Sequence, residues 1–451
     1  MDAMPSHQER LRIAATAARD LLANVTTDRW EVFVKTSLTR HVEVAANRPP
    51  KVTEVDEFGT AVRTSRGDRT GFGAASGAAP DAARRAVEGA LGSEVVSDFD
   101  PLPPQRLLGT AAAATVRPPT PDGWAAHVSG ELAVALLGLS EGTIELRRSI
   151  LQEGVFSWLL MTSEDFVANH HGITTSLLTE VQIRHRQAGV WREWFHIHDP
   201  DTFTAETVAA RIVNRTMLTQ NRIATDSGLR DLILDPEVTA QLLASLAPLF
   251  LATLSDRDPL PGLLNPDGQL ASPALTLVDD RSDPTAPITG PCDGEGLPAR
   301  RTLLLDGGVP RHRLASYRDA IVCGETPRGG ALRLSYRDYP ATGLANLLVE
   351  NSAGLPPARL LESADRALYL LRPLAPVMLD LAGDGYRIVA SGVWLRGDEV
   401  RGWHPVVELQ GSLSRLLRRI EAVGTDLAWF QTDRGCVGAP SLLVRRQPVV
   451  G

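Results

Sequence analysis

The chain has 451 residues, of which 43% are hydrophobic and 22% are charged, a composition typical of a globular protein with two or three domains. Its 54 acidic and 46 basic residues give a formal net charge of −8, and the cations are scattered along the sequence. This balance has the wrong sign for a protein that binds nucleic acid directly.

The three cysteines are widely spaced and form no CxxC pair, which favours free thiols over a disulfide framework or a structural zinc site. The sequence also contains no apolar run long enough to span a membrane and no N-terminal signal peptide. We therefore expect a cytoplasmic protein that does not contact a membrane.

Residues 1–225 are predicted to form an α/β domain made of two similar halves, each with the order helix, strand meander, helix. In the first half, Ser6 and Glu9 form a capping box that starts an amphipathic helix. Hydrophobic and polar residues then alternate as in an antiparallel meander. The alternating runs are 30–35, 41–44, 51–55 and 60–64, and a second helix is expected over 79–91.

The stretch 96–121 is rich in proline, alanine and threonine, and we expect it to connect the two halves. The same order of elements follows it. The expected helices are 128–139 and 204–223, and the expected strands are 143–148, 155–160, 165–169 and 177–184.

Residues 226–451 are predicted to form a second, β-rich domain, which gives the whole chain an α+β fold. Asp235 and Pro236 provide an N-cap and a proline at the first helical position, so a helix is expected there. Short apolar runs between Gly, Pro and Asp residues predict strands beyond it. These runs are 274–278, 301–305, 386–390, 392–396, 405–409 and 440–444, and a late helix is expected over 412–423.

The glycine-rich stretch Gly71–Ser76 departs from the dinucleotide-binding fingerprint, because serine stands at the third glycine position. The chain also lacks a GxSxG elbow and a Walker loop, which disfavours the corresponding enzyme classes. We interpret the stretch as a flexible turn between a strand and a helix.

Two histidines, His196 and His198, would project from one face of a strand, where His170, His171 or Asp199 could add a metal ligand. The aromatic residues beside them fit a half-buried sheet edge equally well. We favour this structural interpretation over a metal site.

The acidic residues Asp293 and Glu295 alternate with glycines in the sequence Asp-Gly-Glu-Gly. Two carboxylates this close can hold a metal or handle a proton. The glycines indicate a sharp turn or a close backbone approach. We favour a structural turn that lines a cleft over a catalytic pair.

Several short segments of the C-terminal half occur in a specific order. They are Leu-Thr-Leu-Val-Asp-Asp at 275–280, Asp-Gly-Glu-Gly at 293–296, Gly-Val at 308–309, Ala-Asn-Leu-Leu-Val-Glu at 345–350, Ala-Val-Gly-Thr-Asp-Leu at 422–427 and Pro-Ser-Leu-Leu-Val at 440–444. Together they resemble the TldD/PmbA family, also called modulators of DNA gyrase, and the resemblance covers nearly the whole chain.

The resemblance implies that a related, TldD-type subunit carries an HExxxH motif, which binds zinc together with a distant cysteine and supplies a glutamate as the base. In this chain the matching helix begins at Asp235, and Ala244, Ser245 and Leu249 stand at the positions of histidine, glutamate and histidine. None of these three side chains can bind zinc or act as the base.

A shifted register does not restore the motif, because no histidine stands between His198 and His312. Cys436 lies near the position of the family's ligand cysteine, but a lone thiol is more typical of a small buried residue. The chain therefore resembles the TldE (PmbA) type of subunit, with no metal or other cofactor of its own.

The resemblance implies a non-catalytic subunit of a heterodimeric zinc metallopeptidase, which would act on small or unfolded peptides or on a peptide-like biosynthetic intermediate. The partner, in a heterodimer or a larger assembly, would be an HExxxH-bearing TldD-type paralogue that holds the zinc. Two glycine-rich loops would line the enclosed cleft, and their candidate residues are Asp293, Glu295, Arg328 and Gly329.

Two other functions remain open. The chain could be a stand-alone metal hydrolase that uses His196 and His198, or a scaffold or binding protein in the maturation of a natural product. Metal analysis of the purified chain would distinguish the first of these from the subunit role.

Overall fold

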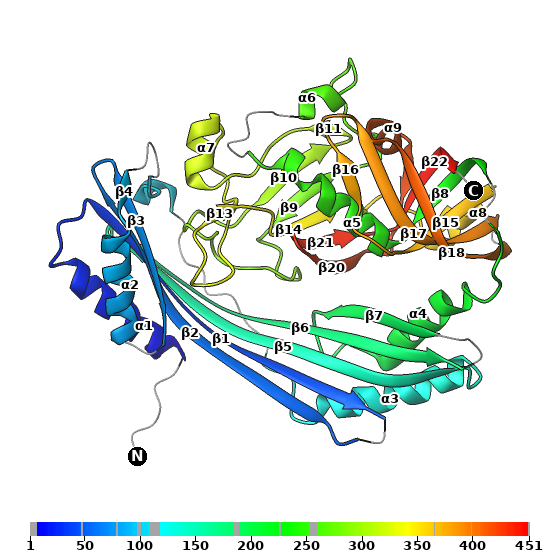
Figure 1. Ribbon diagram of the computed structural model, residues 1–451, viewed down its shortest axis with the longest axis horizontal. Coiled ribbons are helices and arrows are strands. Elements are labelled where there is room, and N and C mark those ends of the chain that lie inside the picture. The colour runs from blue at the N-terminus through cyan, green and yellow to red at the C-terminus, as the bar shows by residue number, and fades with distance from the viewer. Residues whose placement is uncertain are drawn as a thin grey trace.

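The computed structural model has two parts that face each other (Figure 1). The structure describes residues 7–46, 48–77, 80–96, 101–108, 118–184, 189–224, 227–252, 259–364, 366–397 and 399–449. Ser6 of the predicted capping box and much of the predicted connection 96–121 lie outside these ranges. None of the described helices has the length and apolar character needed to cross a membrane.

The N-terminal part carries a long curved sheet with the strand order β4-β3-β2-β1-β5-β6-β7. Its strands are β1 (Arg29–Ala45), β2 (Lys51–Arg66), β3 (Arg69–Ser76), β4 (Val95–Val96), β5 (Ile144–Thr162), β6 (Val167–Ile183) and β7 (Val190–Ile197), and its helices are α1 (His7–Leu22), α2 (Asp81–Gly92), α3 (Trp124–Leu139) and α4 (Ala205–Met217). The order α1, β1–β3, α2 is repeated as α3, β5–β7, α4, which confirms the predicted two halves. The first strands of the halves, β1 and β5, pair with each other, so the halves lie symmetrically about the centre of the sheet.

Individual strands are longer than predicted. The runs 30–35 and 41–44, expected as two strands, both belong to β1, whose pairing with β2 continues unbroken from Arg29 to Glu43. The same merging of two predicted runs occurs in β2, β5 and β6. The polar residues between the runs do not end a strand, because the backbone ladder pairs independently of the side chains.

The glycine-rich stretch Gly71–Ser76 is part of β3 and pairs with β2, so the prediction of a flexible turn is wrong. A Cβ on Gly73 would lie 2.2 Å from the carbonyl oxygen of Ala86 in α2, and one on Gly71 would lie 2.0 Å from that of Ala90. The glycines therefore allow α2 to pack directly on the strand backbone.

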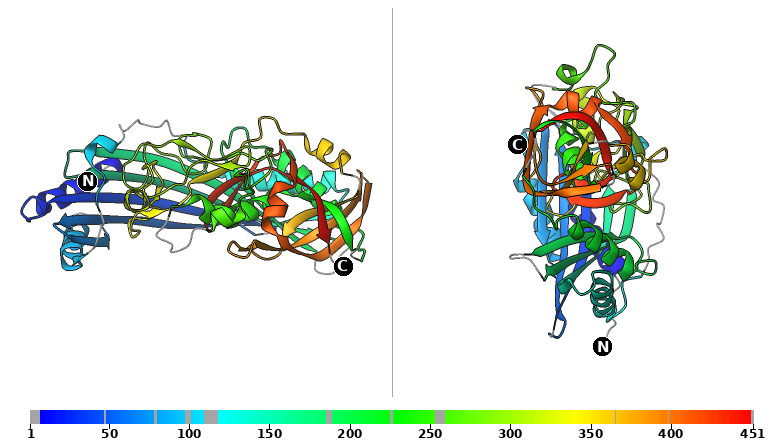
Figure 2. Two further views of the ribbon diagram at one scale, coloured as in Figure 1. Left: turned by 90° about the horizontal axis from the view of Figure 1, so that it is seen from above. Right: turned by 90° about the vertical axis from the view of Figure 1, so that its right-hand side faces the viewer.

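Both helix pairs cover the convex face of the long sheet, one pair at each end (Figure 1; Figure 2). Val32 and Val34 of β1 pack in the cluster that contains α1 and α2, and Val42 packs in the cluster that contains α3 and α4. Because side chains alternate along a strand, Phe33 and Lys35 point to the opposite, concave face. The C-terminal part lies against this face.

The C-terminal part encloses helix α5 (Pro236–Leu246) between two sheets. One sheet has the strand order β11-β10-β9-β14-β21-β20, and the other has the order β16-β17-β15-β8-β22-β19, with β18 paired to β17. The strands are β8 (Gly228–Leu234), β9 (Leu277–Asp280), β10 (Arg301–Asp306), β11 (Val309–Pro310), β14 (Asn346–Val349), β15 (Arg366–Pro373), β16 (Met378–Asp380), β17 (Gly385–Arg396), β18 (Glu399–Ser412), β19 (Ile420–Val423), β20 (Ala428–Thr432), β21 (Gly435–Ala439) and β22 (Leu442–Val449). A small hairpin pairs β12 (Ala331–Leu332) with β13 (Ala341–Thr342).

Short helical segments complete the C-terminal part, and one more, η1, lies in the connection between the two halves of the N-terminal part. They are η1 (Gln105–Leu107), η2 (Ala247–Phe250), α6 (Leu260–Leu263), α7 (Tyr317–Cys323), α8 (Pro357–Glu362) and α9 (Leu413–Arg418). The predicted cap of α5 is confirmed, since the Asp235 side chain accepts a hydrogen bond from the backbone N–H of Glu237 and Pro236 is the first helical residue. The predicted late helix 412–423 is wrong beyond α9, because Ile420 begins strand β19 and pairs with Val444 of β22.

Candidate functional site

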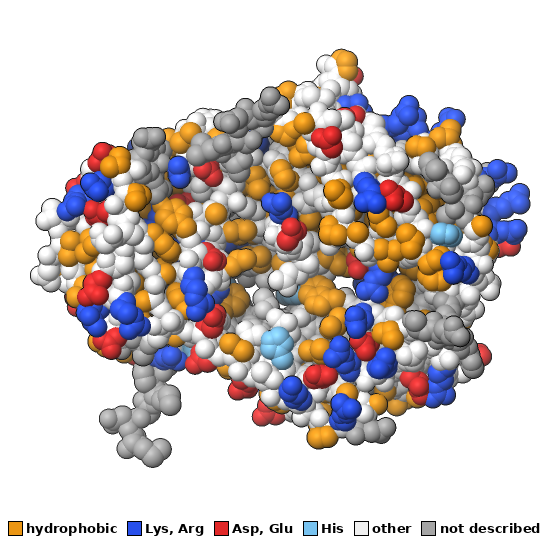
Figure 3. Space-filling model, in the orientation of Figure 1, with side chains coloured by type: hydrophobic (Ala, Val, Ile, Leu, Met, Phe, Trp, Pro, Cys, Tyr) orange, Lys and Arg blue, Asp and Glu red, His pale blue; other side chains and the backbone are white. Residues whose placement is uncertain are grey.

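A cavity of about 530 Å³ lies between the concave face of the long sheet and the C-terminal part. Its floor consists of side chains from neighbouring strands of that sheet. They are Phe33 and Lys35 of β1, Gln152, Phe156, Trp158 and Leu160 of β5, Thr174, Thr175 and Ser176 of β6, and Trp194 and His196 of β7. Figure 3 shows a hollow between the two parts, with a histidine side chain at its margin.

The roof of the cavity comes from loops and strand ends of the C-terminal part. These residues are Ala247, Leu251, Arg281, 287–289, 292–294, 332–334, 342–344 and 431–436. The last of these segments joins β20 to β21, and β20 is the terminal strand of its sheet. Segments far apart in the sequence therefore meet around one space.

The floor of the cavity is largely aromatic. The ring centroids of Phe33 and Trp158 lie 6.1 Å apart. The Phe156 ring covers Gly172 of β6, where a Cβ would come within 2.3 Å of the ring. This surface offers apolar faces to a ligand, while the polar groups stand at the margins, an arrangement typical of small-ligand sites.

Four buried charged side chains join the sheet to the C-terminal part beside the cavity. Arg333 Nη1 lies 2.5 Å from Glu31 Oε1, and Arg63 Nη1 lies 3.2 Å from Glu295 Oε1 and 3.5 Å from Glu31 Oε2. None of the four side chains is more than 3% exposed. Burial raises the pKa of Glu295 to about 7, although Arg63 acts in the opposite direction.

Asp293, one of the predicted cleft residues, borders the cavity, and its carboxylate stabilises the turn that it begins. Its carboxylate accepts hydrogen bonds from the backbone N–H groups of Glu295, Leu297 and Ala331. Burial raises the pKa of Asp293, while the charge of Arg281 and these three donors lower it in part. Both carboxylate oxygens are thus engaged by the backbone.

The other predicted cleft residues, Glu295, Arg328 and Gly329, are not among the residues that border the cavity. Gly329 has a φ of +79°, and a Cβ there would lie 2.9 Å from the Pro298 carbonyl oxygen. Glycine is required at this position because two loops meet. These residues shape the loops behind the cavity wall.

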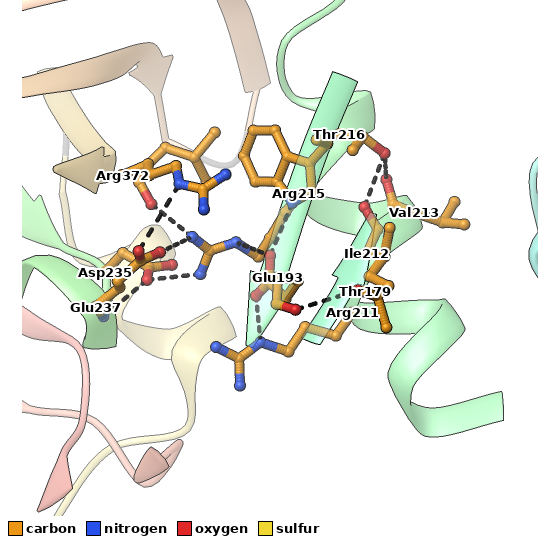
Figure 4. A network of polar contacts seen from close by, with 12 residues as sticks. Thr179, Glu193, Arg211, Ile212, Val213, Arg215, Thr216, Asp235, Glu237 and Arg372 are labelled. Carbon is orange, nitrogen blue, oxygen red and sulfur yellow. Dashed lines mark hydrogen bonds and ion pairs between the residues drawn. The ribbon is translucent and has the colours of Figure 1, made fainter. Parts of the chain in front are cut away.

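A second buried polar cluster joins the two parts at the other end, around Arg215 of α4 (Figure 4). Arg215 Nη1 lies 2.7 Å from Asp235 Oδ1, and its Nη2 lies 3.0 Å from Glu237 Oε2. Nη2 also donates to the Leu371 carbonyl oxygen, and Nε lies 3.5 Å from Glu193 Oε2 of β7. Burial lowers the pKa of Arg215, but Asp235 and Glu193 outweigh this effect and raise it above the ordinary value.

The end of α5 approaches the cavity through Ala247 and Leu251, near Cys436 of β21. The three positions predicted from the sequence lie elsewhere: Ala244 and Leu249 are buried in the C-terminal core, and the Ser245 hydroxyl donates to the carbonyl oxygens of Gln241 and Val377. None of these three borders the cavity.

Among the four histidines considered as ligands, only His196 borders the cavity, with its ring stacked on Trp194 at a centroid distance of 6.3 Å. His198 is exposed beyond the end of β7. His170 is buried and packs on Trp158, and burial lowers its pKa to about 4. Within the part of the chain that the structure describes, no three side chains of His, Cys, Asp or Glu gather into a metal-binding group.

Two family models match the sequence. The PmbA/TldA metallopeptidase domain 1 matches residues 30–93, and the PmbA/TldA metallopeptidase C-terminal domain matches residues 227–451. The chain belongs to the PmbA/TldD family. This membership confirms the resemblance inferred from the ordered segments of the C-terminal half.

Two curated relatives of this PmbA/TldD chain share modest identity with it. A metalloprotease of Synechocystis sp. is 28% identical over 191 residues, which is 40% of this chain and 40% of that protein. An uncharacterized protein of Methanocaldococcus jannaschii is 30% identical over 125 residues, 27% of this chain and 29% of that protein. The alignments therefore span less than half of either relative.

Solved structures show that the whole chain has the PmbA/TldD fold. TldE from Thermococcus kodakarensis superposes with a TM-score of 0.82 at 16% identity, over 98% of this chain and 99% of that one. A candidate modulator of DNA gyrase from Bacteroides thetaiotaomicron superposes with a TM-score of 0.79 at 15% identity, over 99% of this chain and 100% of that one.

The side chains at the end of α5 in this PmbA/TldD chain do not suit a metal ion. Ala247 and Leu251 have no ligand atom, and the buried thiol of Cys436 is the one potential zinc ligand beside them. A zinc ion held by this segment would have one potential ligand where structural and catalytic sites use three or four.

Proposed function

We propose that this chain is a TldE-type, non-catalytic subunit of a two-chain metallopeptidase. The observation that carries the proposal is the segment that follows α5, where Ala247 and Leu251, which have no ligand atom, face the cavity beside the lone thiol of Cys436. In this proposal a TldD-type paralogue with an HExxxH helix holds the zinc, which polarises a peptide carbonyl and activates water when it is bound. The present chain contributes a cavity for the peptide and no catalytic residue.

The shape and lining of the cavity support a peptide as its ligand. Its volume of about 530 Å³ lies within the range of small-ligand sites. Gln431 and Thr432 of β20 border it, and among the described residues β20 pairs only with β21. The free edge of such a strand can pair with an extended peptide, while the aromatic floor accepts apolar side chains.

Co-expression with an HExxxH-bearing paralogue from the same genome tests the proposal. We expect the two chains to elute together in size-exclusion chromatography, and we expect peptide cleavage only in the mixture. Metal analysis of the separated chains should find zinc bound to the paralogue and none bound to this chain. Cleavage by this chain alone, with its own tightly bound metal, would overturn the proposal.

A stand-alone metal hydrolase is the second candidate, because His196 borders the cavity. It would need further ligands that the described residues do not gather around His196. Metal analysis of the wild type and of His196→Ala decides between the two: stoichiometric zinc that is lost in the variant would favour the hydrolase. A scaffold role in natural-product maturation would instead leave the mixture of both chains without peptidase activity.

A further inference from the structure

Three cations meet at the segment 331–334, whose residues 332–334 form one wall of the cavity: Lys35 reaches it from the floor, and Arg281 and Arg333 lie in the roof. Lys35 Nζ donates to the Leu334 carbonyl oxygen and lies 5.3 Å from the centroid of the Phe156 ring. Asp338 and Glu57 lie near enough for their charges to interact with Lys35, but no described carboxylate forms an ion pair with it. Lys35 therefore adds positive potential to this wall.

Arg333 is only partly satisfied by its neighbours. Its Nη1 pairs with Glu31, and its guanidinium lies 4.3 Å above the Phe33 ring. Its Nε and Nη2 are buried and have no hydrogen-bond partner. Glu31 and Glu295 balance the charges of Arg333 and Arg63, so no negative charge of this cluster is left for another cation.

Arg281 makes no ion pair within 4 Å among the described residues, although the buried carboxylates of Asp279 and Asp293 lie near enough for their charges to interact with it. Its residue is 9% exposed, and its only side-chain hydrogen bond with the described residues runs from Nη2 to the Ala331 carbonyl oxygen at 3.3 Å. Its Nε is buried and unpartnered. Two acidic neighbours, Asp279 and Asp293, already accept hydrogen bonds from backbone N–H groups.

A buried guanidinium whose N–H donors are not all hydrogen-bonded is unfavourable, because these donors have lost their hydration without gaining a partner among the described residues. The two arginines border the same cavity, and the planar guanidinium fork fits a carboxylate in two-point contact. We propose that this wall of the cavity binds a carboxylate of the peptide, with Arg281 as its main partner and Arg333 beside it. The inference rests on the proposed function, since it specifies which peptides the cavity takes.

The carboxylate can come from the C-terminus of the peptide or from an acidic side chain, and one binding experiment separates these sources. Three hexapeptide pools of Ala, Ser, Leu and Phe are dialysed against the purified full-length chain. The first pool has a free C-terminal carboxylate, the second is amidated, and the third is amidated and contains one glutamate. Mass spectrometry measures the bound fraction of each pool.

We expect the first or the third pool to bind at least about tenfold more tightly than the amidated pool, and the stronger of the two identifies the source. If all three pools bind equally, the carboxylate site is wrong while the peptide cavity stands. If no pool binds, both the site and the peptide-binding role of the cavity are overturned.

Substitutions locate the effect. Arg281→Gln should abolish the tenfold preference, while Arg281→Lys, which keeps the charge, should retain part of it. Arg311→Gln is the control, because Arg311 is exposed, pairs with Asp306 and does not border the cavity. Thermal unfolding establishes that each variant is folded. A preference that survives unchanged in a folded Arg281→Gln variant would assign the carboxylate to other residues and refute the proposal.

Discussion

Arg215 of α4 and Asp235, the N-cap of α5, lie 2.7 Å apart and connect the helix layer of the N-terminal sheet to the central helix of the C-terminal part. The same carboxylate thus caps a helix and holds an arginine from the other part of the chain. Tyr369 donates a third hydrogen bond to it at 2.6 Å. The orientation of α5 is therefore fixed by residues of both parts.

The substitution Arg215→Ala should destabilise the protein strongly, because it leaves the buried carboxylate of Asp235 without its cation and removes one of the two cations beside Glu237. Loss of one member of a buried ion pair costs roughly 3–5 kcal/mol. Urea unfolding measures the change. The control is Arg387→Ala, whose exposed pair with Glu408 should contribute about 1 kcal/mol or less. Equal effects of the two substitutions would contradict the structural role assigned to Arg215.

Glycine 73 should not tolerate a side chain. In Gly73→Ala the new Cβ would meet the Ala86 carbonyl oxygen at 2.2 Å, so α2 would have to move, at a cost of roughly 1–3 kcal/mol. Gly130→Ala on α3 is the matched control, since nothing lies within 4 Å of the added Cβ. There a gain of about 0.5–1 kcal/mol is expected from helix propensity. Thermal melts of both variants check the opposite signs.

The contribution of His170 to the stability of the protein should fall as the pH decreases from about 6.5 to 4. Burial lowers the pKa of His170 to about 4, so in this window the unfolded chain binds a proton that the folded chain does not take up. The loss of unfolding free energy due to His170 amounts to about 3 kcal/mol at most, because each unit of difference between the folded and unfolded pKa contributes about 1.36 kcal/mol.

The variant His170→Phe keeps a ring beside Trp158 and removes the titrating group, so the loss of stability that His170 causes between pH 6.5 and 4 should be absent from it. His127→Asn serves as the control, since the His127 side chain is exposed on α3. Urea unfolding at several pH values gives the slopes. An unchanged slope in His170→Phe would show that His170 does not titrate with a lowered pKa.

The three thiols should differ sharply in reactivity. Cys323 is exposed, whereas Cys292 and Cys436 are buried, and burial raises the pKa of both buried thiols, that of Cys436 to about 11. A colorimetric disulfide reagent at pH 8 should therefore modify one thiol quickly in the folded protein and all three after unfolding. Cys323→Ser should remove the fast phase. A fast reaction at Cys436 would show that its thiolate is available and weaken the case against metal binding there.

Local sequence signals predicted the elements that depend on local contacts. The cap at Asp235 and the repeated order of helices and strands follow from neighbouring residues. The prediction of the late helix was wrong at its C-terminal end. Leu413, Leu416 and Leu417 are spaced as in a helix, but Ile420 pairs with strand β22. Tertiary pairing overrides periodicity in such a short segment.

The candidate site was predictable only in part. Asp293 stood out because glycines surround it, and it does border the cavity. Arg333 and Glu31, which pair although 302 residues separate them, carried no signal that could connect them. Arg281 was missed for a related reason: its proposed role depends on an Nε that has no hydrogen-bond partner among the described residues, which a single sequence does not reveal.

The buried charge clusters at the two ends of the long sheet act as fixed spacers between the layers. Moving the two parts of the chain apart would break the buried ion pairs of both clusters. The gap between the two parts should therefore keep the same width with and without a ligand. In the proposed role as a peptide site, a gap of fixed width would admit an extended strand more readily than a folded polypeptide. The first property by which the cavity selects a ligand would then be whether the polypeptide is folded, and its sequence would come second.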